Sequence, residues 1–464
     1  MRLTRASAAL FVGLVVLAGS GPGLGNGFTH DDAYVIGHNS RVHSLSHPLS
    51  FFTQSYRPPL SLLGGSTLYR PLTSAGFAVQ WVAGRGQPVA YHLVSLLLYL
   101  LTSLAVLGLA AELLPLGPAT LGALLFAAHP VHVEAVASAA GQSELWVGLF
   151  AAVAVSAYLR GRTAIGLSPA GRYIVYACYL GACLANENGV TLIGLLVAVE
   201  LTLSPAPGDL RAQFASLRDT WVVLLSIAAA VLLARTEVVG SLAGDSPHLV
   251  IAHADFPERI LTMLPVALEW LRLLLWPLRL QIDYGPREIM PAHGFGPAQG
   301  LGLALLALLV GGVVWAWRRR PVLAVGLVWA GIGLFPVSNL LLKSGVLVAE
   351  RTLFLPSIGV MLGLAAAAAA IGDWGPGARR AAVIVGLVGT GLGLARTTLR
   401  QPDWNNNSVL YRRMTIDAPE DYRGHALLAS DLFWHGRRAE AMQQMFVALA
   451  LYPEDPANWS DTAD

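Results

Sequence analysis

Charged residues are scarce in this chain. Only 12% of its 464 residues are Asp, Glu, Lys or Arg, whereas soluble domains carry about 25%. Arginine supplies almost all of the positive charge, and Lys343 is the single lysine. This composition excludes an ordinary soluble domain, and nothing in the charge pattern indicates binding to nucleic acid. Because 55% of the residues are hydrophobic and the mean hydropathy is +0.58, we expect a polytopic membrane protein.

Cysteine is scarce as well. Cys178 and Cys183 are the two cysteines, and both lie within one apolar run. Side chains five residues apart on a helix face different sides, so we expect no disulfide between them. We interpret both as small apolar packing residues, and they do not indicate a redox compartment.

Long apolar runs recur along the chain, and a membrane-spanning helix needs about 20 such residues. A further run, 259–278, contains Pro265, Glu269 and Arg272. Each central charge would cost about 2.5–3.5 kcal/mol in a bilayer, so we expect an interfacial or protein-packed helix there. The sequence therefore predicts an all-α bundle of about eleven spans, near 6–24, 90–112, 118–136, 143–159, 173–185, 188–203, 220–235, 298–317, 321–342, 351–371 and 380–397.

The arginines give an independent test of this threading. If Arg2 and Arg5 lie in the cytoplasm, eleven spans place the other arginine groups there too, as the positive-inside tendency requires. Counting 259–278 as a span would move the last two of these groups outside. The C-terminus is then extracytoplasmic, and the groups predicted to be inside are Arg160, Arg162, Arg172, Arg211, Arg218, Arg318–Arg320 and Arg379–Arg380.

The N-terminal run could be a signal peptide, because the small residues Ala18, Gly19 and Ser20 follow it. With so many later spans we expect an uncleaved first helix instead. In both cases the first loop, about 25–90, is extracytoplasmic. The same threading gathers the unusual polar groups on that side, namely Asp31-Asp32, His129–Glu134, Asn186-Glu187, Gln281–Tyr284 within an interfacial segment at about 257–296, Glu350-Arg351 and the tail.

The tail, 401–464, is polar and differs from the membrane domain, 1–400. Glu440 to Ala448 with Pro453 is typical of the second helix of a tetratricopeptide repeat, and Leu428, Leu432 and Gly436 fit the first helix and turn. The stretch 404–419 is typical of a degenerate half repeat. One complete repeat does not bury its own apolar face. The tail must therefore lean on the membrane domain, pair with a protein partner, or begin an array.

Asp31 and Asp32 are the first candidates for chemistry. Adjacent carboxylates project differently, so one can face a substrate while hydrogen bonds hold the other. A solvated helix cap or turn is the alternative interpretation. The functional role would be that of a general base, which takes a proton from an acceptor hydroxyl.

A second group, His129, His132 and Glu134, lies at the end of the third apolar run. His-x-x-His is a weak metal signal without further ligands, so no metal site is predicted. The group could instead bind a sugar or a phosphate, or simply end a helix at the membrane interface. The sequence leaves these alternatives open.

Two arginines and two carboxylates complete the candidate set. Arg351 could snorkel harmlessly beside Glu350 at the start of a span, or its guanidinium could pair with a lipid-linked phosphate. Arg70 lies on the same side and is a second candidate for the phosphate. Glu187 lies between two apolar runs and needs no special explanation as a loop residue.

Motifs that run in order along nearly the whole chain resemble the transmembrane and tetratricopeptide-repeat O-mannosyltransferase family. This family is part of the GT-C class of polyprenyl-phosphate-sugar-dependent glycosyltransferases. The motifs are Asp31-Asp32-Ala33-Tyr34-Val35-Ile36, Tyr69-Arg70-Pro71-Leu72-Thr73-Ser74, Phe126-Ala127-Ala128-His129-Pro130-Val131-His132-Val133-Glu134-Ala135-Val136, Trp276-Pro277-Leu278 with Asp283-Tyr284, Val337-Ser338-Asn339-Leu340 and Ala349-Glu350-Arg351-Thr352-Leu353-Phe354-Leu355-Pro356-Ser357.

The resemblance implies a GT-C-type bundle that transfers a sugar, typically mannose, from a polyprenyl phosphate carrier to an extracytoplasmic hydroxyl. Protein serine and threonine are among the acceptors that it implies. It assigns the base to Asp31, with Asp32 as the second choice, and contacts with the leaving phosphate to Arg351 and His132. In one motif the family usually has Ser-Lys-Glu where this chain has Ala185-Asn186-Glu187. Either Arg351 or Arg70 replaces that lysine, or the donor differs, or the activity is lost.

Two other functions stay open. The acceptor could be a lipid or a glycan, or the chain could be a non-catalytic scaffold whose tail recruits a protein partner. A transporter is disfavoured because charges at mid-membrane and duplicated halves are not apparent. The arginine bias and the short tail favour a bacterial inner membrane over the endoplasmic reticulum.

Overall fold

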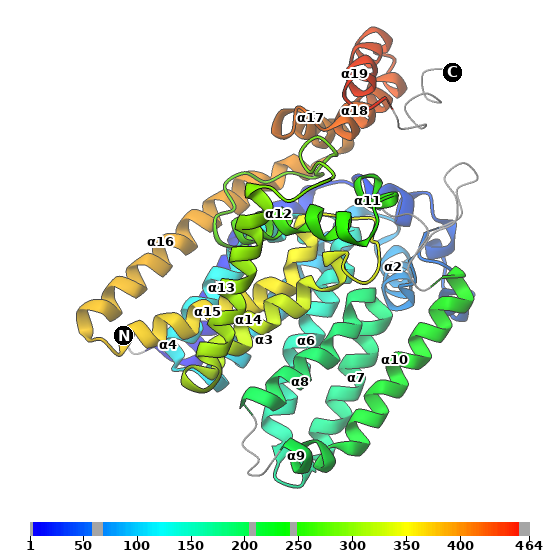
Figure 1. The fold of residues 1–464 in the computed structure, drawn as a ribbon. Coiled ribbons are helices and arrows are strands. Elements are labelled where there is room, and N and C mark those ends of the chain that lie inside the picture. Colours follow the sequence, from blue (N-terminus) through cyan, green and yellow to red (C-terminus); the bar gives the residue numbers. More distant parts are fainter. Residues whose placement is uncertain (1–2, 58–67, 204–209, 242–247, 454–464) are drawn as a thin grey trace.

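The computed structural model describes residues 3–57, 68–203, 210–241 and 248–453. Helices dominate this part of the chain, and its strands form one small antiparallel hairpin in which Thr163 pairs with Gly166 (Figure 1). The all-α prediction is therefore confirmed. The elements are α1 (Arg5–Ser20), α2 (Pro71–Gly84), α3 (Pro88–Leu113), α4 (Leu116–Ala127), α5 (Val133–Ala137), α6 (Gln142–Gly161), β1 (Arg162–Thr163), β2 (Gly166–Leu167), α7 (Pro169–Ala185), α8 (Leu192–Leu203), α9 (Leu210–Ser216), α10 (Arg218–Val239), α11 (Leu249–Ala252), α12 (Phe256–Leu275), α13 (Pro297–Arg319), α14 (Pro321–Leu334), α15 (Phe354–Gly372), α16 (Pro376–Arg400), α17 (Asn407–Asp417), α18 (Tyr422–Trp434) and α19 (Arg438–Leu451).

Seven helices within the described residues are long and apolar enough to cross a membrane. Counting the pair α4 and α5, which bends by 45° at its break, gives up to eight. Each of the eleven predicted spans contains a helix, but α7, α8 and α14 are shorter than a full span. For example, α14 ends at Leu334, and Pro336 shortly after it disfavours continuation because proline lacks the N–H that an α-helix uses. A multi-pass membrane protein is thus supported, whereas the count of eleven spans is not confirmed.

The helix α12 covers the ambiguous run and is not among these candidate spans. Pro265 has no N–H to donate to the Leu261 carbonyl, and the Gln299 side chain of α13 donates to that oxygen instead, at 3.4 Å. Glu269 and Arg272 form an ion pair on the surface of α12. Since the charges are paired and the freed carbonyl has a partner, α12 is stable packed against α13.

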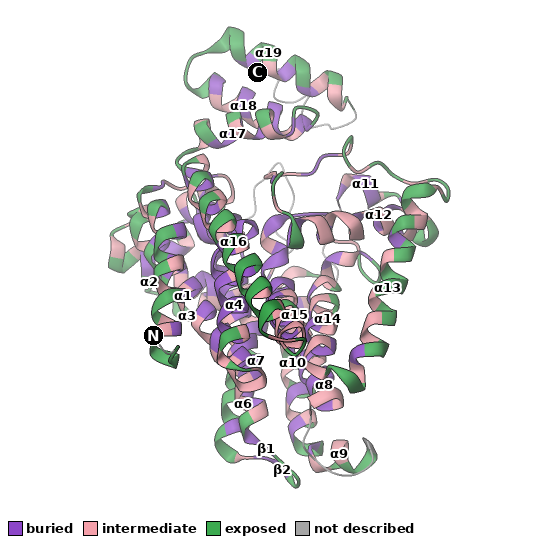
Figure 2. Cartoon of the chain, turned by 90° about the vertical axis from the view of Figure 1, so that its left-hand side faces the viewer, coloured by how far each residue is buried: buried purple, intermediate pink, exposed green. Residues whose placement is uncertain are grey.

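The bundle has two chemically different ends. We call one the Asp31 end; it carries Asp31, Glu134, Glu187 and Glu350. The opposite, Arg162 end carries the β1–β2 hairpin and the start of α10, and Figure 2 shows this hairpin far from α17–α19. Arg5 and Arg160 line one hollow at the Arg162 end, so arginines that were predicted to share the cytoplasmic side do lie together.

The core of the bundle lies between α3, α4, α6 and α15. Tyr99, Phe126 and Phe354 pack edge-on or tilted against one another, with ring centres 5.5–6.1 Å apart. In contrast, α13 and α16 expose large apolar side chains along their outer faces (Figure 2). Such continuous apolar surface is expected where helices meet hydrocarbon rather than water.

Close packing of α14 on α15 fixes the segment that carries Glu350 and Arg351. A Cβ on Gly326 would lie 2.6 Å from the Gly359 carbonyl oxygen, and a Cβ on Gly359 would lie 2.5 Å from that of Gly326. The two helices could not approach this closely with larger residues. The 3-10 turn Glu350–Leu353 leads directly into α15, so the position of Arg351 is set by this crossing.

Beyond α16 the described part of the tail, up to residue 453, forms the helices α17, α18 and α19 at the Asp31 end (Figure 1). Gly436, with φ of 76°, makes the left-handed turn between α18 and α19. The tail leans on the membrane domain through one cluster of buried residues, which includes Val133 and Ala137 of α5 together with Trp404, Leu410 and Leu428. This contact covers an apolar face that a single helical unit would leave exposed. The assignment to a tetratricopeptide repeat stays a prediction.

Candidate functional site

Asp31 lies in the first loop with its carboxylate between two guanidinium groups. Its Oδ1 is 2.8 Å from Nη2 of Arg57, and its Oδ2 is 4.0 Å from Nη2 of Arg351. The Asp31 side chain is 21% exposed, so a molecule at the Asp31 end could still reach it. Burial by itself would raise the pKa of Asp31, but the nearby His30, Arg57 and Arg351 outweigh it and hold this pKa at about 2. Asp31 is therefore a carboxylate at any neutral pH.

Asp32 occupies the opposite environment, because its side chain is fully buried. Its Oδ1 accepts hydrogen bonds from the Ser138 hydroxyl at 2.9 Å and the Ala140 amide at 2.8 Å, and its Oδ2 accepts from the Thr29 amide at 3.3 Å. These bonds tie the first loop to the connection between α5 and α6. Burial raises the pKa of Asp32 in spite of them. The geometry gives Asp32 a supporting position and leaves Asp31 facing outward.

Arg351 is held in place by Glu134. The Glu134 carboxylate forms an ion pair with the guanidinium, and its Oε2 also accepts from the backbone amide of Arg351 at 2.8 Å. Glu134 is 2% exposed, whereas the Arg351 side chain is 32% exposed. Glu134 thus fixes the direction of Arg351, and the guanidinium is the part of this pair that meets solvent.

A third ion pair joins Arg70 to Glu187. The Glu187 Oε2 is 2.8 Å from Nε of Arg70, and its Oε1 accepts from the Tyr69 amide at 2.9 Å. Burial alone would raise the pKa of Glu187, but Arg70 and the backbone hydrogen bonds that the carboxylate accepts together lower this pKa below its ordinary value. The Arg70 guanidinium also lies 5.2 Å from the centre of the Tyr56 ring, a cation–π arrangement.

Asn186, which stands at the position of the expected lysine, is buried beside Arg70. Its Nδ2 donates to Oε1 of Glu144 at 2.9 Å and to the Ser143 hydroxyl at 3.2 Å. Nη1 of Arg70 reaches the same hydroxyl at 3.1 Å. The Arg70 guanidinium therefore brings a positive charge next to the place where a lysine is missing.

The two predicted histidines point into the protein instead of toward Asp31. His129 is bonded to the Leu274 carbonyl oxygen at 3.0 Å. His132 lies between the Tyr99 hydroxyl, at 3.0 Å, and the Ser357 hydroxyl, at 2.8 Å. Both rings are more than nine-tenths buried. Both histidines are neighbours of Glu134 in the sequence. In the structure, however, they form internal hydrogen bonds that hold helices together.

Glu350 is also internal. It forms an ion pair with Arg400 at the end of α16, and its Oε1 accepts from the Gln281 amide at 2.7 Å. These contacts join the start of α15, the end of α16 and the predicted interfacial segment. Of the nine predicted site residues, the structure places Asp31, Arg351 and Glu134 in one cluster and Arg70 with Glu187 in a neighbouring one.

Sequence reasoning missed Arg57, Ser143 and Arg400. Arg57 lies in the same polar loop as Asp31, and a count of loop cations could have found it. Arg400 is the partner that buried Glu350 requires, because an unpaired buried carboxylate is costly. Nothing local marks Ser143, whose role depends on α2, α6 and the α7–α8 connection meeting at one point.

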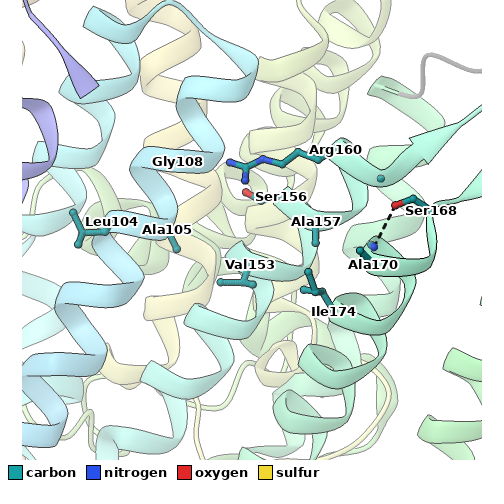
Figure 3. Close-up of a pocket in the computed structure, with 12 residues that line it drawn as sticks. Leu104, Ala105, Gly108, Val153, Ser156, Ala157, Arg160, Ser168, Ala170 and Ile174 are labelled. Atoms are coloured by element: carbon teal, nitrogen blue, oxygen red, sulfur yellow. Dashed lines mark hydrogen bonds between the residues drawn. The ribbon is translucent and has the colours of Figure 1, made fainter. Parts of the chain in front are cut away.

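A hollow of about 460 Å³ lies away from these residues, at the Arg162 end between α3, α6 and α7 (Figure 3). Small residues such as Gly108, Ala157 and Gly171 line it. Arg160 at its edge reaches toward α3, where it pairs with Glu112. No described group of three or more His, Cys, Asp and Glu side chains is arranged to hold a metal ion.

Comparison with known proteins finds relatives in animals. The protein O-mannosyl-transferase TMTC3 of Mus musculus is 28% identical over 72% of this chain and 39% of its own length. TMTC4 of Mus musculus is 26% identical over 94% of this chain and 65% of its own length, and TMTC1 of Homo sapiens is 25% identical over 96% and 55%. The chain thus spans about two fifths to two thirds of the length of these relatives.

No protein-family profile matches the chain. Among solved structures, the archaeal oligosaccharyltransferase AglB from Archaeoglobus fulgidus covers 90% of this chain and 59% of its own, with a TM-score of 0.49 and 14% identity.

Proposed function

We propose that the chain is a membrane glycosyltransferase that moves mannose from a polyprenyl phosphate carrier to a hydroxyl acceptor at the extracytoplasmic face. The observation that carries the proposal is the cluster at the Asp31 end. There an ionised carboxylate lies 2.8 Å from Arg57 and 4.0 Å from Arg351. A base for the acceptor and cations for the leaving phosphate are the two groups that such a transfer requires.

The proposed reaction is a single displacement. The acceptor oxygen gives its proton to the Asp31 carboxylate and forms a bond to the anomeric carbon of the sugar. The bond from that carbon to the phosphate oxygen breaks, and the lipid phosphate leaves with the electron pair. One displacement inverts the configuration at the anomeric carbon.

The arginines link phosphate binding to the strength of the base. A carboxylate whose pKa is about 2 is a weak base while Arg57 and Arg351 face it. A bound phosphate shares the charge of these guanidinium groups, so the pKa of Asp31 rises when the donor is present. Asp31 is thereby activated only in the complex, which limits unproductive proton transfer in the free protein.

Arg70 is the proposed substitute for the family lysine. Its guanidinium and the Asn186 amide share the Ser143 hydroxyl, so a cation is retained beside this site. This arrangement favours a working transferase over loss of activity. Glu134 orients the guanidinium of Arg351, and Glu187 orients that of Arg70, because charge-assisted hydrogen bonds to a carboxylate restrict the geometry of an arginine.

The names of the relatives support mannose as the sugar and a protein as the acceptor. The arginine bias of the chain favours a bacterial inner membrane as its location. The tail, which leans on the Asp31 end, is suited to presenting a protein acceptor. A lipid or glycan acceptor and a non-catalytic scaffold are the competing functions.

The test uses the purified full chain in lipid nanodiscs. Polyprenyl-phosphate mannose and polyprenyl-phosphate glucose are supplied in turn, with serine- and threonine-containing peptides, a glycolipid or an oligosaccharide as acceptors. We expect mannose on the peptide, with inverted configuration by NMR. Transfer to the glycolipid or oligosaccharide alone would assign the acceptor differently, and absence of transfer from every donor would favour the scaffold.

A further inference from the structure

The start of the tail is hydrogen-bonded to the residues that immediately precede Asp31. Asn26 donates its Nδ2 to the Gln401 carbonyl at 3.1 Å, and the Gly27 amide donates to the Asn405 carbonyl at 2.8 Å. The backbone amide of His30 donates to Oδ1 of Asn407 at 2.8 Å. Three bonds therefore join 26–30 to 401–407 across more than 370 positions of sequence.

His30 needs such a bond because its backbone is unusual. Its φ of 50° lies in the left-handed region, which residues other than glycine seldom adopt. Backbone conformations of this kind persist only where the surroundings hold them. Besides the bond to Asn407, the His30 ring meets the Tyr411 ring edge-on at 6.2 Å. Both of these contacts come from α17.

The left-handed turn at His30 decides where the next residue points. Immediately after it the chain turns into the short helical segment that begins with Asp31 and Asp32, whose first bonds are from the Asp32 amide to the Thr29 carbonyl and from the Ala33 amide to the His30 carbonyl. Asp32 is anchored beneath by Ser138 and Ala140. The left-handed φ at His30 therefore helps to set the direction in which Asp31 leaves the turn, above the anchored Asp32.

We propose that Asn407 is a positioning residue for the transfer reaction, which acts through the His30 amide to aim the Asp31 carboxylate. The inference rests on the proposed function, and it makes the first turn of the tail part of the transfer machinery. It differs from simple docking of the tail, because docking depends on the apolar contacts of Trp404, Leu410 and Leu428.

The chain supplies a matched control in the neighbouring asparagine. Asn406 is the N-cap of α17, and its Oδ1 accepts from the Val409 amide at 3.0 Å. Asn406→Ala removes a bond within the tail, whereas Asn407→Ala removes the bond to the first loop. Both changes shorten an asparagine on the same turn, so a general loss of tail stability would affect them alike.

The experiment measures steady-state transfer in nanodiscs for the wild type, Asn407→Ala, Asn407→Asp and Asn406→Ala. We expect Asn407→Ala to lower kcat at least tenfold with the donor KM within twofold of the wild type. Asn407→Asp keeps an oxygen for the His30 amide and should restore most of kcat. Asn406→Ala should keep the wild-type kcat and lower only the melting temperature.

Hydrogen exchange of the peptide covering 26–34 provides a readout that does not depend on activity. We expect Asn407→Ala to exchange faster there, and Asn406→Ala to exchange faster at the start of α17 but not at 26–34. Wild-type kcat in Asn407→Ala, or equal losses of kcat in Asn406→Ala and Asn407→Ala, would overturn the proposal. If the wild type transfers no sugar, the proposed function fails, and unchanged exchange at 26–34 in Asn407→Ala would separately overturn the tie to His30.

Discussion

Two arginine–glutamate pairs lie at opposite ends of the bundle and differ in what surrounds them. At the Arg162 end, the side chains of Arg162 and Glu200 are 1% and 0% exposed. Glu200 also accepts from the Tyr158 hydroxyl at 2.6 Å, and Arg162 reaches Ser216 at 3.2 Å. At the Asp31 end, Glu134 is as buried as Glu200, but the Arg351 guanidinium reaches solvent and faces Asp31 at 4.0 Å.

The difference separates a structural pair from a pair that can meet a ligand. A guanidinium has five N–H donors in a fixed fork. The fork of Arg162 is enclosed by protein acceptors, which include the Thr163 and Gly166 carbonyls. Nη2 of Arg351 is beyond hydrogen-bond distance from Asp31. An oxyanion placed there would complete its bonds, so the same residue types stabilise the fold at one end and can bind substrate at the other.

The largest expected effect comes from a substitution that removes the proposed base at the Asp31 end without changing the shape of the side chain. Asp31→Asn keeps the size of the side chain but removes the base, and we expect kcat for sugar transfer to fall by about 10²–10⁴-fold, the usual contribution of a general base. Radiolabelled mannose transferred to a peptide measures this. Asp219→Asn, at an exposed aspartate of α10, is the control and should retain activity. Equal turnover in Asp31→Asn and the wild type would remove the base assignment.

The next largest effect comes from removing the ion pair at the Arg162 end. Arg162→Met leaves the Glu200 carboxylate buried without its partner, which typically costs about 3–5 kcal/mol of unfolding free energy. We expect a lower denaturation midpoint in detergent and an unchanged kcat per folded molecule. Arg351→Met also leaves a buried carboxylate, that of Glu134, without its partner, so we expect it to lose stability and, unlike Arg162→Met, to lose most of kcat as well. The comparison would be wrong if both variants lost kcat equally.

A smaller expected effect is that the stability of the tail, which lies at the Asp31 end, depends on pH. Asp421 is buried at the N-cap of α18, and burial together with Asp283 raises its pKa to about 7 from 3.8. The folded tail therefore holds a proton between these values that the unfolded tail releases. Stability from this group is complete below about pH 4 and is lost as the pH rises through 7.

Limited proteolysis of the tail measures this dependence. We expect slower cleavage within 407–451 at pH 5.5 than at pH 8, and little difference in Asp421→Asn, which has no charge to lose. Asp421→Asn also keeps an oxygen for the Arg423 and Gly424 amides. Faster cleavage at pH 5.5 in the wild type would contradict the assignment.

The order in which polar and apolar segments follow one another along the chain was enough to predict which candidate residues lie at the same end of the bundle. Asp31, Glu134 and Arg351 come from three distant segments, and spans with alternating direction bring them to one side. The same reasoning could not separate Glu134, which holds Arg351, from a residue that meets solvent. That distinction depends on burial, which is set by the crossing of α14 and α15 and is not local.

The histidines show the limit most clearly. His129 and His132 have the spacing of ligand residues, but His132 lies between hydroxyls of α3 and α15. Neither Tyr99 nor Ser357 is close to His132 in the sequence, so no local pattern could reveal its internal role. Likewise, the left-handed turn at His30 is stabilised by Asn407 from the far end of the chain. The count of eleven spans is not confirmed for a similar reason, because helix ends depend on prolines and packing as well as on hydropathy.

The most direct test of the central claim is a cryo-EM structure with a non-hydrolysable donor analogue, mannose linked to a polyprenyl phosphonate. We expect the phosphonate oxygens within hydrogen-bond distance of Arg351 and Arg57, and the anomeric carbon on the side of Asp31. A phosphonate bound at the Arg162 end, beside Arg160, or one that contacts neither Arg351 nor Arg57, would contradict the assignment of the Asp31 end as the site of sugar transfer.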